Sequence, residues 1–222
     1  MIYLREDISQ KVCLLSKPIG NKKKGKYNMK RILSALLISL VATVASAGEV
    51  GDFVKNTAEK VKVGINKSKD IKEFTEYMNT AVVPEEIIDF TKLSQLTLGH
   101  QWRKLSDAEK AEFSKEYKDF LYGFYVKSMF KFKNSEIVYR REITTGESGK
   151  LKTEVYYKEE GESRTATIEY VLNKTPKGWR ISDVVIEGIT LSLSYKDVFS
   201  KMINEKGFPA LIQELKTKNA IK

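Results

Sequence analysis

Few residues in this 222-residue chain have side chains suited to catalysis. His100 is the single histidine and Cys13 the single cysteine. A lone histidine lacks the partners that a metal centre needs, and the sequence contains no Gly-x-Ser-x-Gly nucleophile motif. It also has no phosphate-binding loop, His-Glu-x-x-His or EF-hand pattern. We therefore expect no catalytic residue, no metal and no cofactor, and we place His100 as a polar residue at a helix junction.

Two acids, Asp89 and Asp183, have the most apolar sequence neighbours. A carboxylate held in an apolar pocket can act as a general base, so an enzyme that uses one of them is one hypothesis. The alternative is structural, with Asp183 accepting hydrogen bonds where a sheet meets a helix. Glu187, just before Gly188, fits an edge or turn position by the same logic.

The positive charge of the chain is concentrated near its N-terminus. The formal net charge is +10, but residues 1–47 hold nine of the 39 basic residues and two of the 29 acidic ones. The remaining residues carry a net charge of only +3. A nucleic-acid partner therefore loses its main support, because such binding needs a basic surface.

The sequence MKRILSALLISLVATVASAGEV, starting at Met29, has the layout of a secretory signal. Two basic residues precede an apolar run of about 13 residues, and Ala45-Ser46-Ala47 has the small-x-small pattern of a signal-peptidase site. A bilayer needs about 20 helical residues, so the run is too short to span. We expect a signal peptide at 29–47 that is cleaved near Ala47, and a single mature domain at 48–222. An uncleaved anchor is the alternative.

Residues 1–28 add nothing to such a signal, so we expect the natural start at Met29 and regard 1–28 as an upstream extension. Cleavage would remove Cys13, which leaves the mature chain without disulfides or thiolate chemistry. A cysteine-free exported protein suits the oxidising bacterial periplasm.

Helical periodicity covers the first part of the mature chain, with a polar break at residues 66–70. Pro84 fits a first helical turn and Gly99 a helix C-cap. Ser106 and Glu109 form a capping box that predicts a helix to about Phe130. One broad face of that helix is rich in aromatic residues, which either fill the core or form the wall of an apolar cavity.

After Asn134 the apolar period changes to two, as in strands. Ile137, Tyr139 and Ile143 define the first strand, and two more follow at 151–157 and 166–172, joined by short turns. We predict a fourth strand from Trp179 to Leu193, bent at Gly188, and closing helices from Phe199 and over 208–218. Short connections make the strands antiparallel neighbours, so the predicted fold class is α+β with helices packed on a four-stranded sheet.

Several sequence blocks resemble the MlaC family, also called toluene-tolerance proteins, which are periplasmic phospholipid carriers of the lipid-asymmetry pathway. The blocks that carry the resemblance are Val82 with Pro84, Leu98-Gly99 with Trp102, Ser106 to Leu121, Trp179 with Asp183-Val184, Glu187 to Leu191, and Tyr195 with Phe199. Thr190 stands where the family usually has serine. The resemblance spans most of residues 50–218.

This resemblance implies an NTF2-like antiparallel four-stranded sheet with helices enclosing an apolar cavity for phospholipid acyl chains. It also implies shuttling between an outer-membrane lipoprotein complex and an inner-membrane ABC transporter with an MCE-domain protein. We expect a monomer. The residues expected to contact lipid are Phe113, Tyr117, Phe120, Leu121, Phe124, Tyr125, Val155, Tyr157, Ile168, Tyr170, Trp179, Ile181, Val184, Ile186, Ile189, Leu191, Leu193, Tyr195 and Phe199.

Two other functions remain open at this stage. One is an enzyme on an NTF2-like scaffold with Asp183 or Asp89 as base. The other is a non-catalytic envelope interaction module whose core is solid.

Overall fold

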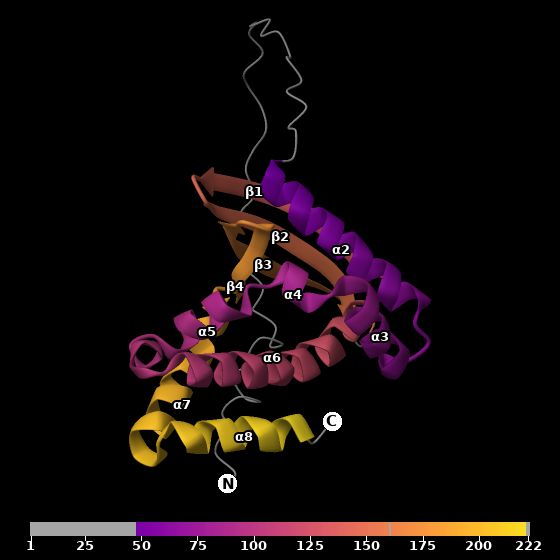
Figure 1. Ribbon diagram of the computed structural model, residues 1–222. Coiled ribbons are helices and arrows are strands. Elements are labelled where there is room, and N and C mark those ends of the chain that lie inside the picture. The colour runs from indigo at the N-terminus through magenta and orange to yellow at the C-terminus, as the bar shows by residue number, and fades with distance from the viewer. Residues whose placement is uncertain (1–47, 160, 221–222) are drawn as a thin grey trace, which may run out of the picture. The chain divides into compact units, whose positions relative to one another are not determined.

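The computed structural model describes residues 48–159 and 161–220 (Figure 1). The predicted signal peptide and upstream extension lie outside these residues. The elements run in the order α2 (Glu49–Lys67), α3 (Ile71–Tyr77), the π-helix η1 (Met78–Val82), α4 (Pro84–Ile87), α5 (Phe90–Leu98), η2 (Gln101–Lys104), α6 (Asp107–Met129), η3 (Phe130–Phe132), β1 (Glu136–Thr145), β2 (Ser148–Glu159), β3 (Glu162–Thr175), β4 (Gly178–Ile186), β5 (Ile189–Thr190), α7 (Leu191–Lys206) and α8 (Phe208–Ala220).

Local sequence signals set several helix ends where they were predicted. The capping box is complete, because the Ser106 side chain accepts from the Glu109 amide and the Glu109 carboxylate accepts from the Ser106 amide. Pro84 occupies the first turn of α4. Gly99 ends α5 with φ +55° and ψ −120°, a backbone conformation that favours glycine. These ends follow from residues within one helical turn of each other.

The sheet is an antiparallel meander with strand order β1-β2-β3-β4-β5. Directly paired residues share a face of the sheet, so Leu151, Tyr170 and Val184 lie on one face, which we call the inner face. Helix α2 packs on this face through Val50 and Val54. That contact closes the first core of the domain.

The predicted fourth strand was too long. Strand β4 ends at Ile186, Glu187 and Gly188 form a turn with φ of +50° and +81°, and after the two-residue strand β5 the chain becomes helix α7 at Leu191. The residues from Leu191 to Phe199 are therefore helical. The apolar residues on both faces of this stretch fit a strand buried on both sides, but short apolar runs do not distinguish a strand from a helix.

The first predicted strand also needs a correction. A β-bulge between Tyr139 and Arg141 shifts the register of β1 against β2. Ile137 and Tyr139 keep the inner side, but Ile143 pairs with Lys150 and is 44% exposed. Because strand side chains alternate with a strict period of two, one extra residue exchanges the two faces.

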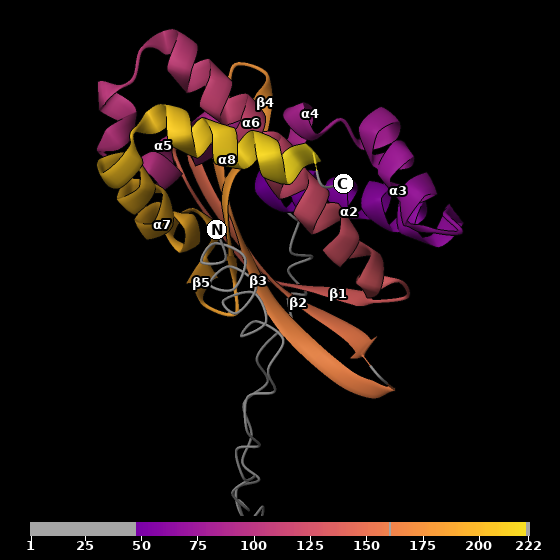
Figure 2. The same ribbon diagram turned by 90° about the horizontal axis from the view of Figure 1, so that it is seen from below.

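The helices after α2 form a second group around α6. Helix α6 approaches α5 and α8 closely, and α7 approaches α5 and α8. Figure 2 shows α8 running alongside α6. On another side of α6, Val126 packs with Ile65, Phe74, Met78 and Val82 from α2, α3 and η1. Among the described helices, none has the length and apolar character needed to cross a bilayer.

Candidate functional site

Helix α6 and helix α7 share a tightly packed aromatic cluster, which we define as Phe113, Tyr117, Tyr195 and Phe199. Each of these side chains is at most 2% exposed. Their ring centroids lie 5.3–6.0 Å apart in stacked and edge-to-face pairs, the geometries that aromatic rings favour. Burial raises the pKa of both tyrosines. The cluster is therefore an interior filled by its own rings.

Asp183 holds the start of α7 beside this cluster. Its carboxylate accepts from the Ser192 hydroxyl at 2.5 Å and from the Ser192 amide at 3.2 Å. Thr190, the N-cap residue of α7, makes no side-chain cap. A buried residue of β4 thus supplies the cap from the sheet, and the carboxylate also suits the positive end of the helix dipole.

The other polar candidates also have structural contacts. Asp89 caps α5 by accepting from the Lys92 amide at 2.8 Å, and its second oxygen accepts from the Asn173 amide group at 3.2 Å. Glu187 sits in the β4–β5 turn, and its carboxylate accepts from the Thr167 amide. His100 is exposed between α5 and η2. Each acid is thus engaged in holding backbone or side-chain groups of the fold.

A second group of apolar residues is only half-buried, and we call it the inner-face layer. Its sheet members lie on the inner face of β2, β3 and β4, and its helix members on α6. They are Tyr157, Ile168, Tyr170, Val184, Ile186, Phe120, Phe124 and Tyr125. Helix α6 reaches this side of the sheet through η3, where Phe132 packs edge-on against Tyr157 at 4.9 Å. Tyr170 and Val184 also pack against the core beneath α2, and Phe120 packs edge-on against Tyr195 at 5.6 Å, but every residue of the layer keeps some exposed surface.

Two tyrosines of the inner-face layer are enclosed although water still reaches them. Tyr170 and Tyr125 are half-buried by accessible surface. Burial nevertheless raises the pKa of each to about 12, because desolvation disfavours the charged phenolate. Both phenols therefore lie among neighbouring side chains, although part of each residue stays exposed.

The remaining predicted lipid contacts fall elsewhere. Leu121 is buried on α6, and Val155, Trp179 and Ile181 are buried in the sheet, the last two against α2. Leu191 is half-buried at the start of α7, while Ile189 and Leu193 are 42% and 57% exposed. The structure thus divides the predicted set among the aromatic cluster, the sheet core, the inner-face layer and the surface. Lipid contact stays a prediction for all of them.

Two residues of the same region were not predicted as lining. Tyr139 is half-buried against the core between α2 and the sheet, and burial raises its pKa. Phe132 touches Tyr157 from η3. The alternation of β1 marked Tyr139 as inward-facing, which was a usable signal. Phe132 follows the end of the predicted helix, where helical periodicity no longer indicates whether a side chain faces the interior or solvent.

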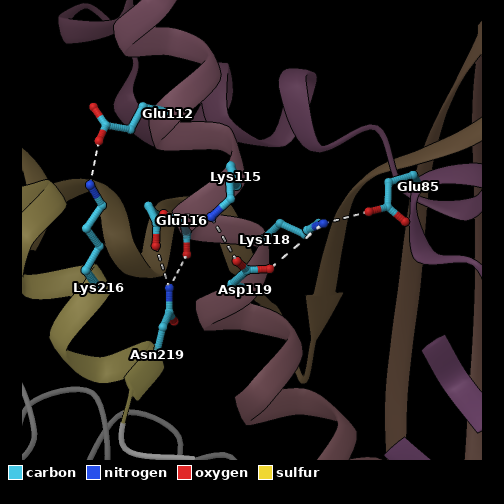
Figure 3. A network of polar contacts seen from close by, with 8 residues as sticks. All are labelled: Glu85, Glu112, Lys115, Glu116, Lys118, Asp119, Lys216 and Asn219. Atoms are coloured by element: carbon cyan, nitrogen blue, oxygen red, sulfur yellow. Dashed lines mark hydrogen bonds and ion pairs between the residues drawn. The ribbon is translucent and has the colours of Figure 1, made fainter. Parts of the chain in front are cut away.

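Polar contacts brace α6 from both sides (Figure 3). Toward α8, Glu116 accepts from the Asn219 side chain at 3.0 Å, and Lys216 pairs with Glu112 at 2.7 Å. Toward α4, Lys118 pairs with Glu85 at 2.6 Å. Burial would raise the pKa of Glu116, but bonds from Lys115 and Asn219 outweigh it and lower the pKa. These contacts hold α6 in place independently of its apolar faces.

The described residues show no group of three or more histidine, cysteine, aspartate or glutamate side chains placed to hold a metal ion. The candidate site consists of the half-buried apolar side chains of the inner-face layer, and the caps at Ser106 and Asp183 fix the starts of α6 and α7.

Comparisons with known proteins agree with this fold. The structure is similar to that of a phospholipid-binding protein from Ralstonia solanacearum solved in complex with a phospholipid, with a TM-score of 0.65 and 22% identity, over 76% of this chain and 96% of the other. No curated protein matches the sequence. The family model of the MlaC protein matches residues 53–217. This chain belongs to the MlaC family.

Proposed function

We propose that the mature chain is a periplasmic phospholipid carrier that holds acyl chains against the inner-face layer. Family membership supports this function, and so does a fold shared with a protein solved with a bound phospholipid. The single observation that carries it within this chain is the set of incompletely covered apolar side chains of the inner-face layer, on β2, β3, β4 and α6.

The energetics of lipid transfer explain why such a surface is useful. Each methylene removed from water contributes about 0.8 kcal/mol, so a lipid with roughly 28 methylenes resists free water by about 20 kcal/mol. A carrier needs to offer an interior that is about as favourable as the bilayer. Aliphatic and aromatic side chains whose surface is not already used in the core provide that environment.

The aromatic cluster has a different part in this proposal. Its rings already contact each other, so a lipid chain would have to displace them at a large cost in packing. We therefore assign acyl contact to the inner-face layer, and we assign to Phe113, Tyr117, Tyr195 and Phe199 the role of holding α6 and α7 together. This proposal removes these four residues from the set that the sequence predicts to contact lipid.

Export and partners complete the proposal. The signal-like segment supports secretion to the periplasm with cleavage near Ala47, which makes 48–222 the mature domain. The family supports exchange with an inner-membrane ABC transporter carrying an MCE-domain protein and with an outer-membrane lipoprotein complex. Because Asp183 and Asp89 are both engaged in helix caps, we propose that the chain is not an enzyme.

Native mass spectrometry of the protein purified from the periplasm tests the proposal. We expect a bound molecule whose fragments identify it as phospholipid. We also expect the mass of the intact chain to match a chain that begins at Gly48. A lipid-free protein that also takes up no lipid from phospholipid vesicles would overturn the carrier function. A chain that retains residues 29–47 would overturn the proposed cleavage. It would not decide lipid binding, which is tested separately by the bound mass.

A further inference from the structure

The side chain of Glu142 lies over the first turn of α2. Its Oε2 atom accepts from the Gly48 backbone nitrogen at 3.1 Å and from the Gly51 amide at 3.0 Å. Both contacts are partly buried, and they connect strand β1 to residues more than 90 positions earlier in the chain. Gly48 is the N-cap of α2 and has no side chain of its own to cap the helix.

The β-bulge of β1 is what brings Glu142 to this place. Beyond the bulge, Glu142 pairs with Leu151, whose side chain is buried on the inner face beneath α2. Without the extra residue the alternation would turn Glu142 outward and Ile143 inward. The bulge therefore leaves Ile143 exposed and places the Glu142 carboxylate at the start of α2.

The space above Gly48 is filled by this carboxylate. A Cβ atom at residue 48 would lie 2.2 Å from Glu142 Oε1, so any larger residue would push the carboxylate away. The next residue is anchored as well, since the Glu49 carboxylate accepts from Trp179 Nε1 at 3.0 Å and pairs with Lys174 at 2.8 Å. The beginning of α2 is thus held at two successive positions.

Gly48 is also the residue that directly follows the small-x-small sequence Ala45-Ser46-Ala47. Hydrolysis of the Ala47–Gly48 bond adds water across it, so Ala47 departs with a carboxylate and the Gly48 nitrogen takes up protons as an α-ammonium. A positive charge at a helix N-terminus is unfavourable because of the helix dipole. A carboxylate at hydrogen-bonding distance reverses that penalty.

We propose that Glu142 binds the new N-terminus created by signal cleavage. Its carboxylate forms an ion pair with the Gly48 α-ammonium, and this ion pair stabilises the packing of α2 on the sheet. The inference rests on the proposed export and cleavage. It gives Glu142 a role that begins only when the chain is processed, and it accounts for glycine as the first mature residue.

A charge cycle on the mature chain tests the ion pair. Residues 48–222 form one compact unit that contains the packing described above. The four proteins are the chain starting at Gly48, the same chain preceded by one alanine, and both again with Glu142→Gln. The added alanine keeps the Gly48 amide as a donor but moves the charge, and glutamine keeps an oxygen acceptor without charge. Urea unfolding is measured at pH 7 and at pH 10.

We expect the chain starting at Gly48 to have an unfolding equilibrium constant about two- to fivefold lower than its extended counterpart at pH 7. The carboxylate favours the charged amine, so this advantage is complete below the ordinary α-amino pKa of about 8 and is lost as pH rises through the higher folded value. When both chains carry Glu142→Gln, the chain starting at Gly48 should be no more stable than the extended chain. It should be less stable if the α-ammonium is repelled by the helix dipole.

Equal stability of the free and extended chains at pH 7, or an unchanged difference after Glu142→Gln, would overturn the ion pair. The mass of the exported protein separates this outcome from failure of the proposed processing, because a mature chain that starts elsewhere shows that cleavage was misplaced. Gly48→Ala gives a second measurement. It should remove the advantage when Glu142 is present and have little effect beside Glu142→Ala.

Discussion

The aromatic cluster and the inner-face layer both draw residues from α6, yet they differ in how completely the protein covers them. In the cluster, Phe113 and Phe199 are enclosed by other rings from α6 and α7. In the layer, Phe124 and Tyr170 keep surface that no side chain covers. The difference separates two uses of the same residue types, because close packing contributes stability whereas uncovered apolar surface is free for a ligand.

Truncating one ring in the cluster gives the largest expected effect. Phe199→Ala should lower the free energy of unfolding by about 3–5 kcal/mol, since it leaves a cavity among rings that cannot close around it. Urea denaturation of the lipid-stripped protein measures this. Phe124→Ala is the matched control from the layer and should cost clearly less. Equal losses would show that the two regions are packed alike.

The cap of α7 should give the next largest effect. Asp183→Ala leaves the buried Ser192 amide and hydroxyl without their acceptor, which costs about 2–3 kcal/mol. Asp89→Ala removes a less buried cap and should cost about 1 kcal/mol. Both follow from chemical denaturation monitored by circular dichroism. If Asp183→Ala proved no worse than Asp89→Ala, the proposed role of Asp183 in fixing α7 beside the cluster would be wrong.

A charge in the inner-face layer should affect lipid more than folding. We expect Ile168→Asp to reduce bound phospholipid about tenfold, equivalent to about 1.4 kcal/mol, because an acyl chain cannot hydrate the carboxylate. Leu193→Asp, at a 57% exposed position, is the control and should retain its lipid. Phospholipid per protein, from extraction and mass spectrometry, is the measurement. Loss of lipid in both variants would count against the layer as the binding surface.

Acid should weaken the contact between α6 and α8 by the smallest amount. The pKa of Glu116 is lowered in the folded protein, where bonds from Lys115 and Asn219 outweigh burial. Its stabilisation is therefore present above the ordinary glutamate pKa and lost as pH falls through the folded value. Between pH 5 and pH 3, the Glu116→Gln variant should therefore lose about 0.5 kcal/mol less free energy of unfolding than the wild type.

The exposed Glu112, paired with Lys216, provides the matched variant for this measurement. Glu112→Gln should change the same acid profile less than Glu116→Gln does. A Glu116→Gln profile parallel to wild type would mean that the contact with Asn219 makes no difference to stability.

Local signals predicted most of the fold, because they act between residues that are close in the chain. The capping box at Ser106, the glycine at position 99 and the short turns between strands each depend on a few adjacent residues. The family resemblance was confirmed by the match over residues 53–217. The errors at Leu191 and Ile143 arose where an apolar period allowed two structures, and a distant contact or a single inserted residue selected between them.

The division of the aromatic residues could not be predicted for a related reason. Phe120 and Phe113 lie on one broad face of α6 and look equivalent by periodicity, yet only Phe113 is fully buried. Both rings contact α7, since Phe120 packs edge-on against Tyr195 at 5.6 Å and Phe113 against Phe199 at 6.0 Å, so burial depends on which further side chains surround each ring. Sequence spacing within α6 carries no information about those contacts.

The sequence by itself determined most of the element types, the antiparallel meander and the family, since periodicity, caps and turns are short-range properties of the chain. Only the tertiary structure decided which apolar residues are used up in packing, where Asp183 caps α7, and that a β-bulge aims Glu142 at Gly48. Those outcomes depend on contacts between segments tens of residues apart. Such contacts form only when the burial of several elements together offsets the entropy of ordering them.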